Sequence, residues 1–207
     1  MKSFKRLFMF VMLLGLLGVP AYAEDAAQAP AADAKAAADK EMQEKMMKMM
    51  APGEAHKALE PLVGKWNYTA KFWMMPEAKA DESTGTSESS MIYGGRFLKQ
   101  EVKGMWNGQP FEGMGYTGYD NIRGEYISIW IDGMATGIMK ASGQYDAASK
   151  TFNLSGSNSC PLTGEKDRQG RSETKIADND HNTYSSYAAG PDGKEFKMME
   201  IEYTRAA

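Results

Sequence analysis

One short segment of the sequence gathers residue types that could recognise a small molecule. It spans 126–132 and alternates with period two, the spacing of a β-strand. Isoleucines fill one face, and the other face carries Tyr126, Ser128, Trp130 and Asp132. Two interpretations are open. If the isoleucines fill the interior, the aromatic and polar face lies outside. If that face points inward, it forms an apolar wall with convergent polar groups, as ligand pockets do.

Other side chains would complement this face if it points inward. Tyr116 and Trp66 would extend the aromatic wall, and the guanidinium of Arg96 would provide a counter-charge for an acidic ligand. The competing interpretation is an interior filled by side chains, since a barrel of about eight strands has the size at which filled and ligand-holding interiors both occur. The sequence leaves this choice open.

The sequence contains no recognisable catalytic constellation. Neither of the two histidines nor Cys160 stands in a known zinc, protease or hydrolase motif. Residues 113–118 spell G-x-G-x-x-G, but a turn and another strand-like segment follow, where a dinucleotide site needs a helix. We therefore predict no cofactor, and a haem site would need His181 inside the barrel. A hydrolase or isomerase built on Asp132, Arg96 and His181 is a distant alternative.

Methionines recur at helical spacing before the strand-like segments begin. A helix and turn are predicted over 41–60, with one stripe formed by Met42, Met46, Met49 and Met50. Thioethers favour Cu(I), so the weak metal-site candidates are Met46, Met49, Met50 and His56. The spacing already matches an amphipathic helix, which favours packing on the barrel or on a protein partner. We therefore predict no metal site.

The elements that position these residues are short strands between turns. Alternation predicts strands over 65–73, 86–92, 96–106, 111–119, 125–131, 136–142, 151–155, 172–176, 183–188 and 196–204. Dipeptides such as Asn107-Gly108 supply the positive φ angles of tight hairpins. No helical segment separates the strands, which excludes a doubly wound parallel sheet. We predict an all-β fold over 61–205, an antiparallel up-and-down barrel of about ten strands with a short N-terminal helix. A two-sheet β-sandwich is the alternative.

The N-terminal region has the composition of a signal peptide. Residues 1–23 combine a basic start, an apolar core too short to span a bilayer, and the cleavage pattern Ala21-Tyr22-Ala23. We predict export to the periplasm or secretion, with no membrane span after cleavage. Residues 24–40 are rich in alanine and lack bulky apolar residues, which predicts a disordered tether. The mildly acidic balance, with a net charge of −3 for the whole chain, argues against nucleic acid and anionic membrane surfaces as partners.

Several stretches together carry a resemblance to a known family. They include Pro52-Gly53-Glu54-Ala55-His56, Gly94-Gly95-Arg96-Phe97-Leu98 and Gly118-Tyr119-Asp120-Asn121, and the ending over 191–205 fits as well. Over 42–205 the sequence resembles the domain-of-unknown-function 1579 family (DUF1579). The resemblance implies a calycin-like barrel, distantly similar to lipocalins, fatty-acid-binding proteins and nitrobindins. It implies no known activity and no established catalytic residues.

Two functional hypotheses from different classes follow. The first is an exported barrel that binds a small apolar or amphipathic molecule, anchored by Trp130 and Tyr126. The second is an interaction protein with a filled barrel, which uses the methionine-rich helix or an outer aromatic face against a protein partner. The state of the barrel interior distinguishes them.

Overall fold

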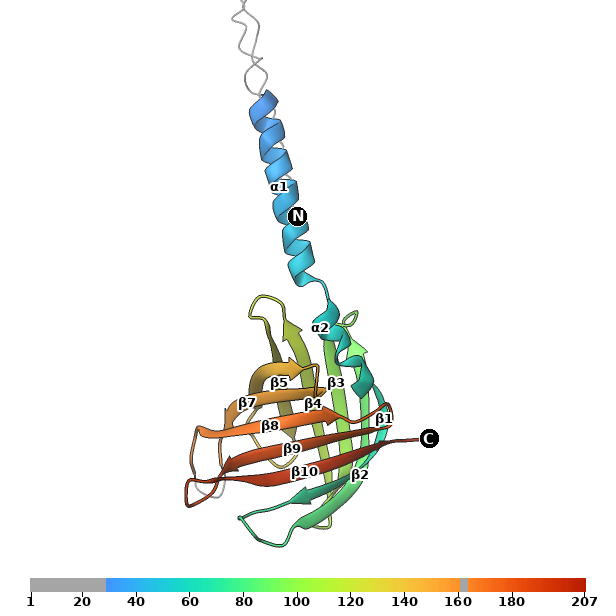
Figure 1. Ribbon diagram of the computed structural model, residues 1–207, viewed down its shortest axis with the longest axis vertical. Helices are drawn as coiled ribbons and strands as arrows, with labels where there is room; N and C mark the ends of the chain where they lie inside the picture. Colours follow the sequence, from blue (N-terminus) through green and yellow to red (C-terminus); the bar gives the residue numbers. More distant parts are fainter. Residues whose placement is uncertain (1–28, 161–163) are drawn as a thin grey trace, which may run out of the picture. The chain divides into compact units, whose positions relative to one another are not determined.

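A computed structural model of the chain describes residues 29–160 and 164–207 (Figure 1). The predicted signal peptide and the first residues of the predicted tether lie outside the described residues, so export stays a prediction. The chain divides into two compact units, Met1–Lys45 and Met46–Ala207. Most of helix α1 (Ala29–Met50) belongs to the first unit, and the second contains all the remaining helices and strands.

Helix α1 begins inside the segment that we predicted to be a disordered tether. Alanine has the highest helix propensity and dominates residues 29–38, so local preference alone favours helix there. Met46, Met49 and Met50 near its end are exposed rather than packed on the barrel. Among the described residues, no helix is both long enough and apolar enough to cross a membrane.

Ten antiparallel strands form the body of the second unit. They are β1 (Gly64–Phe72), β2 (Asp81–Ile92), β3 (Phe97–Trp106), β4 (Gln109–Asp120), β5 (Glu125–Asp132), β6 (Met139–Asp146), β7 (Thr151–Asn158), β8 (Arg168–Ile176), β9 (His181–Ala189) and β10 (Glu195–Arg205). Each strand pairs with its neighbours in sequence, and β1 also pairs with β10, which closes the sheet. Closure confirms the predicted up-and-down barrel, and the sandwich alternative is wrong.

Four strands differ from their predicted bounds by three or more residues, namely β2, β6, β7, which ends at Asn158 rather than at 155, and β8, which begins at Arg168 rather than at 172. Strand β2 begins at Asp81 rather than at 86, because residues 81–85 lack the apolar alternation that identifies a strand, yet they pair with β1. Strand β6 begins at Met139 rather than at 136. The carboxylate of Asp132 accepts hydrogen bonds from the amides of Met134 and Ala135, so a turn lengthens the β5–β6 loop.

One end of the barrel is sealed by the segment that precedes β1. Helix α2 (Glu54–Lys57) and the 3-10 turn η1 (Glu60–Leu62) flank Leu59, whose side chain is 0% exposed. Leu59 packs in one core cluster with Leu98, Tyr126, Phe152, Leu154 and Ile176. His56 of α2 is buried as well: its Nδ1 accepts a hydrogen bond from the Gly53 amide at 3.0 Å.

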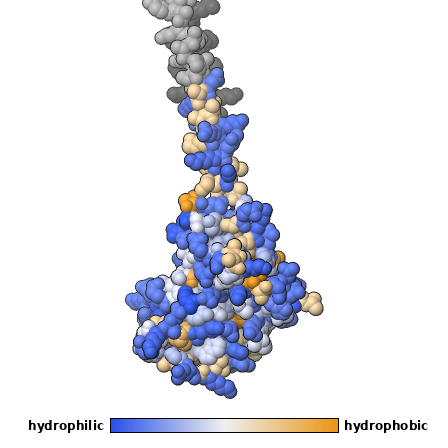
Figure 2. Space-filling view, viewed as in Figure 1, coloured by the Kyte–Doolittle hydropathy of each residue, from blue (hydrophilic) through white to orange (hydrophobic). Residues whose placement is uncertain are grey.

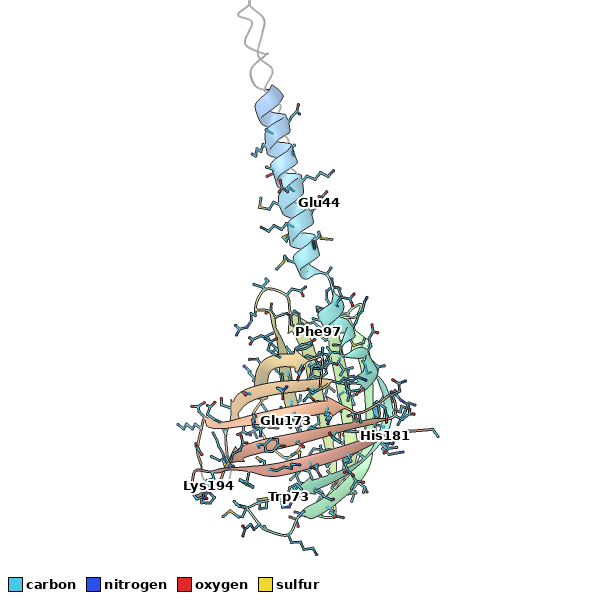
Figure 3. The ribbon with its side chains drawn as sticks, in the orientation of Figure 1. Glu44, Trp73, Phe97, Glu173, His181 and Lys194 are labelled. Carbon is cyan, nitrogen blue, oxygen red and sulfur yellow. The ribbon has the colours of Figure 1, made fainter. Side chains whose placement is uncertain are left out.

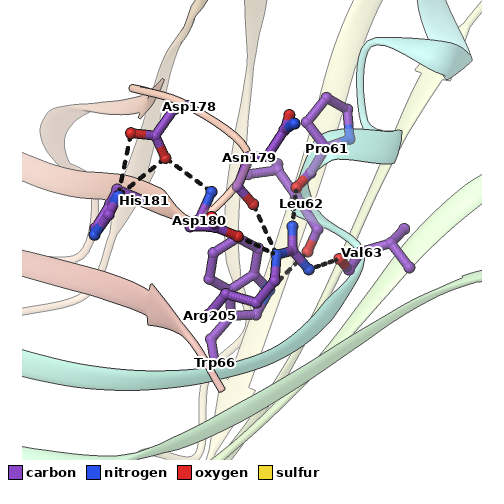
Figure 4. A network of polar contacts seen from close by, with 9 residues as sticks. All are labelled: Pro61, Leu62, Val63, Trp66, Asp178, Asn179, Asp180, His181 and Arg205. Atoms are coloured by element: carbon purple, nitrogen blue, oxygen red, sulfur yellow. Dashed lines mark hydrogen bonds and ion pairs between the residues drawn. The ribbon is translucent and has the colours of Figure 1, made fainter. Parts of the chain in front are cut away.

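The seam between β1 and β10 is held by Arg205 at the sealed end (Figure 4). Its guanidinium donates hydrogen bonds to the carbonyls of Val63 (2.9 Å) and Asn179 (2.7 Å). It also lies 4.2 Å from the centroid of the Trp66 ring and pairs with Asp180 at 3.3 Å. One side chain thus joins the last strand, the segment before the first strand, and the β8–β9 turn.

The outer surface of the barrel is mostly hydrophilic on the face seen in Figure 2, with scattered hydrophobic patches. An outer ion-pair group on β8 and β10, including Arg171 and Glu195 at 2.7 Å, contributes to this character. The distribution follows the period-two alternation of strands that have one face in the barrel and one in water.

Loss of the Arg205 contacts is expected to destabilise the seam. Arg205→Met keeps most of the aliphatic stem but removes the hydrogen bonds to Val63 and Asn179. We expect the free energy of unfolding in urea to fall by about 1–3 kcal/mol. Lys194→Met, which removes only an exposed pair with Asp192, is the control and is expected to change it by less than about 0.5 kcal/mol. Equal losses in the two variants would contradict the role of the seam.

Protonation of His56 is expected to weaken the sealed end. Burial lowers the pKa of His56; a hydrogen bond to the Tyr119 backbone opposes this shift, and the charge of Arg96 adds to it. Because the fold favours the neutral ring, this stabilisation is present above the ordinary pKa of 6.5 and is lost as pH falls through the folded-state pKa.

The measurement is the unfolding free energy of the wild type and of His56→Gln, compared at about pH 7.5 and about pH 5. The glutamine does not titrate, so other acid effects cancel in the difference between the two proteins. We expect the advantage of the wild type to shrink at the lower pH. A difference that stays constant or grows would contradict the assignment.

Candidate ligand-binding lumen

The aromatic and polar face of β5 points into the barrel. Tyr126 is 3% exposed and belongs to the core, whereas Ile131 on the opposite face is 44% exposed. Cross-strand pairing places Ser128 beside Thr117 and Trp130 beside Gly115, on the same inward face. Of the two interpretations of this segment, the structure therefore shows the inward one.

Tyr126 belongs to the sealed floor of the lumen. Its hydroxyl donates a hydrogen bond to the Ala55 carbonyl at 2.7 Å, and its ring meets those of Tyr119 and Phe152, each at 4.9 Å between centroids. Burial raises the pKa of Tyr126 to about 12. The phenol is therefore protonated and engaged, so it shapes the floor instead of offering a vacant polar group.

Trp130 forms the wall above that floor, and two glycines make room for it. A Cβ on Gly113 would lie 2.3 Å from Cζ2 of Trp130, and one on Gly115 would lie 3.0 Å from its Cε3. The indole Nε1 donates a hydrogen bond to Asp132 at 2.9 Å, so the carboxylate that caps the turn also orients the ring. The glycines of the G-x-G-x-x-G stretch thus accommodate a side chain, and a strand follows them where a dinucleotide site needs a helix.

The middle of the lumen is lined by hydroxyl groups. Thr117 and Ser128 form a hydrogen bond at 3.1 Å, and the buried phenol of Tyr184 bonds the hydroxyls of Ser172 and Ser186, with its pKa raised by burial. Apart from that phenol oxygen, many inward side chains here are only partly buried. Beside these hydroxyls, Trp130 and Tyr184 pack against a second core cluster, which consists of Trp66, Tyr68, Ala70, Val102 and Tyr203.

Charge is confined to the rims of the lumen. In the described strands, the inward positions that carry charged side chains are terminal ones, namely Asp81, Asp132, Arg168 and Arg205. Arg168 donates a hydrogen bond to the Ala189 carbonyl, and Asp132 caps a turn. A molecule in the lumen would meet aromatic faces and hydroxyls, and no counter-charge between the rims.

Two predicted site residues lie elsewhere. Tyr116 alternates with the inward Thr117 and faces outward, where its hydroxyl contacts the sulfur of Met114 at 3.1 Å. Arg96 lies in the β2–β3 turn at the sealed end and donates hydrogen bonds to the carbonyls of Tyr93 and Met50. The prediction that these two line the lumen is wrong, because β4 presents its glycines inward and Arg96 precedes β3.

Trp66 faces inward but is part of the packed sealed end. It is 2% exposed, its Nε1 donates a hydrogen bond to the Leu62 carbonyl at 3.1 Å, and Arg205 stacks on its ring. It supports the seam and packs with Tyr68 and Tyr203 in the second core cluster.

Neither histidine faces the open lumen. His181 alternates with the inward Asn182, faces outward, and contacts the carboxylate of Asp178 at 2.9 Å (Figure 4). His56 is engaged in the sealed end. Within 29–160 and 164–207, no group of three or more histidine, cysteine, aspartate or glutamate side chains could hold a metal ion. Asp132 and Arg96 lie at opposite ends of the barrel, so the constellation suggested for a hydrolase or isomerase is not assembled.

Sequence reasoning missed the hydroxyl wall. Its members on β8 and β9 are Ser172, Thr174, Tyr184 and Ser186. These residues alternate with charged or small residues, which is the pattern that could have identified them. Because the alternating positions include few apolar side chains, the pattern did not show which face of the strand points inward and which faces water.

Two shallow hollows lie at the rim opposite α2. One, of about 340 Å³, lies among Trp73, Met75, Pro76, Glu77, Phe196 and Lys197. The other, of about 310 Å³, lies beside Met105 and the start of β2. The hollows place Trp73, Phe196 and Met105 at the end of the barrel opposite α2.

Filling the space beneath Trp130 is expected to displace its ring. Gly113→Ala should lower the free energy of unfolding by about 1–3 kcal/mol and shift the tryptophan emission. Gly137→Ala is the matched control, since a Cβ there meets nothing within 4 Å, and we expect a change of less than about 0.5 kcal/mol. If both variants matched the wild type in stability and emission, Gly113 would not be needed to seat the indole.

Comparison with known proteins supports the fold. No curated protein matches the sequence. The crystal structure of Rv2717c from M. tuberculosis is similar at 18% identity and a TM-score of 0.55, covering 76% of this chain and 100% of that chain. The structure of a redesigned β-barrel, b11L5F_LGL, is 12% identical with a TM-score of 0.38, covering 75% of this chain and 100% of that chain. At this identity, the likeness to Rv2717c shows the fold alone.

The family model agrees with the resemblance drawn from the sequence. It covers 51–205, which is α2, η1 and the whole barrel without α1. By this match the chain belongs to the family described as "Protein of unknown function (DUF1579)".

Proposed function

We propose that the barrel binds an uncharged, partly apolar small molecule in the open half of its lumen. The observation that carries the proposal is the contrast between the two ends. Leu59 and Tyr126 close one end, while inward side chains toward the other end keep part of their surface exposed. A closed sheet with one sealed end is a cup, a common form of ligand-binding barrel.

The chemistry of the wall supports the ligand class. The indole of Trp130 offers an aromatic face, and the Thr117–Ser128 pair offers a donor and an acceptor beside it. An ionised ligand would lose its hydration without gaining a partner between the rims, which disfavours it strongly. The acidic ligand considered for Arg96 is therefore not part of the proposal.

We also propose that the protein acts after export, in the periplasm or as a secreted protein. The support is the N-terminal sequence pattern of residues 1–23. A barrel in that location would meet small molecules before they reach the cell interior.

A second candidate is an interaction protein. The observation in its favour is the set of exposed methionines Met46, Met47, Met49 and Met50 at the end of α1, which a partner could cover. In that case the exposed surface inside the lumen would have no role. The experiment below separates the two candidates.

The binding proposal is tested with N-phenyl-1-naphthylamine, an uncharged aromatic amine that fluoresces in apolar surroundings. We expect saturable binding to the wild-type chain. Ser128→Leu, which adds bulk inside the lumen, should weaken it by about tenfold or more. Ile129→Leu, at the next position of β5 but facing outward, is the control and should bind as the wild type does.

Native mass spectrometry of the chain purified from its own compartment gives the complementary measurement. An adduct that is lost on denaturation and absent from Ser128→Leu would identify the natural ligand by mass. If the probe shows no saturable binding, or binds equally to wild type and Ser128→Leu, the lumen is not the binding site and the interaction protein is favoured.

A further inference from the structure

The loops at the open end of the barrel differ sharply in character. In this antiparallel order, the β1–β2, β3–β4, β5–β6, β7–β8 and β9–β10 loops all lie opposite the sealed end. Figure 3 labels Trp73 and Lys194 at the open end, and Phe97 near α2. The first three loops are consecutive around the rim and form one continuous half of it.

That half of the rim carries a set of exposed apolar side chains, here termed the apolar arc. They range from 36% exposed at Met139 to 61% at Met134, and the arc consists of Met74, Met75, Met105, Met134, Ile138 and Met139. All lie in or beside the β1–β2, β3–β4 and β5–β6 loops. Exposed apolar residues that gather on one surface, in contrast to scattered ones, indicate contact with another apolar surface.

The loops of the arc carry few charges, although Asp81 and Asp132 flank them, and the other half of the rim carries more. Residues 133–138 carry no charged side chain, and residues 73–80 carry one of each sign, Glu77 and Lys79. The described part of the β7–β8 loop contributes Glu165, Lys166 and Asp167, and the β9–β10 loop contributes Asp192 and Lys194. The rim is therefore amphipathic, with its apolar half on β1 to β6.

Two residues of the arc also lie at the hollows of the rim. Met75 lies in the 340 Å³ hollow with Trp73 and Phe196, and Met105 lies beside the 310 Å³ hollow. A surface that covers the arc would therefore face the mouth of the barrel directly.

We propose that the apolar arc docks the open end of the barrel on a zwitterionic phospholipid surface. Unbranched methionine side chains on separate loops adapt to a soft surface that has no fixed shape. Glu77, Asp81 and Asp132 outnumber Lys79 beside the arc, so anionic lipids gain no electrostatic advantage there, and the net charge of −3 opposes them as well. Apolar area buried at the lipid interface supplies the attraction. The docking does not depend on the proposed ligand, but it would let an apolar molecule enter the lumen without crossing water.

The test uses the full chain and vesicles of phosphatidylcholine, with ordinary or brominated acyl chains. Bromine quenches tryptophan only at the depth of the acyl chains. The four tryptophans are Trp66, Trp73, Trp106 and Trp130, so the N-terminal segment before the barrel has no reporter and cannot mimic docking. We expect emission to fall in brominated vesicles, and we expect most of that loss to disappear in Trp73→Phe.

The arc itself is tested by Met75→Ser/Met134→Ser/Ile138→Ser, in which quenching is expected to be lost. The matched control is Tyr93→Ser/Ile122→Ser, which removes exposed apolar residues from turns at the sealed end and should be quenched like the wild type. Far-UV circular dichroism checks that both variants keep the barrel.

Three results would overturn the proposal. Equal emission in the two kinds of vesicle would show that the open end does not reach acyl chains. Unchanged quenching in the arc variant would place the lipid contact elsewhere. A wild type that is dimeric without vesicles and an arc variant that is monomeric would make the arc an interface between copies of the chain.

Discussion

The pairing of the first strand with the last is the constraint on which the rest of this structure depends. Without β1–β10 pairing the sheet would have two long edges with unpaired backbone groups, and no inside. The seam joins residues far apart in sequence, so it has a large loop-closure cost. Arg205 helps to offset that cost where it binds the carbonyls of Val63 and Asn179 and stacks on Trp66. The same contacts position the segment that seals the barrel, so closure and sealing share one set of interactions.

Closure of the sheet determines which residues face the barrel interior, and the positions of glycines determine where large rings fit in that interior. Tyr68 lies where Cβ atoms on Gly85 and Gly104 would be, at 2.6 and 2.1 Å from its hydroxyl, and Trp130 does the same over Gly113. A large ring on one strand thus lies over glycines of the neighbouring strands, in the space that their side chains would otherwise fill. The interior therefore contains two packed clusters of rings and aliphatic side chains, with hydroxyl groups beside them.

The strand number and the closed topology were predictable because turn residues and alternation recur along the whole chain. The inward face of β5 was not predictable, since isoleucines and aromatic residues are equally suited to a core. Only pairing with the glycine face of β4 resolves it. Tyr116 was misplaced for the same reason: a one-residue change of phase exchanges the faces of a strand. Arg96 was misplaced because composition cannot reveal at which end of a barrel a turn lies.

The topology also explains why the apolar arc could not be predicted from the sequence. In a meander that begins at the sealed end, every loop after an odd-numbered strand reaches the opposite end. Met75, Met105 and Met134 stand about thirty residues apart, and each looks like an isolated exposed methionine. The closed sheet makes them one surface beside the mouth, while the loops after even-numbered strands share the end that α2 and Leu59 seal. The end at which the chain enters the barrel therefore determines which end is sealed and at which end the apolar arc lies.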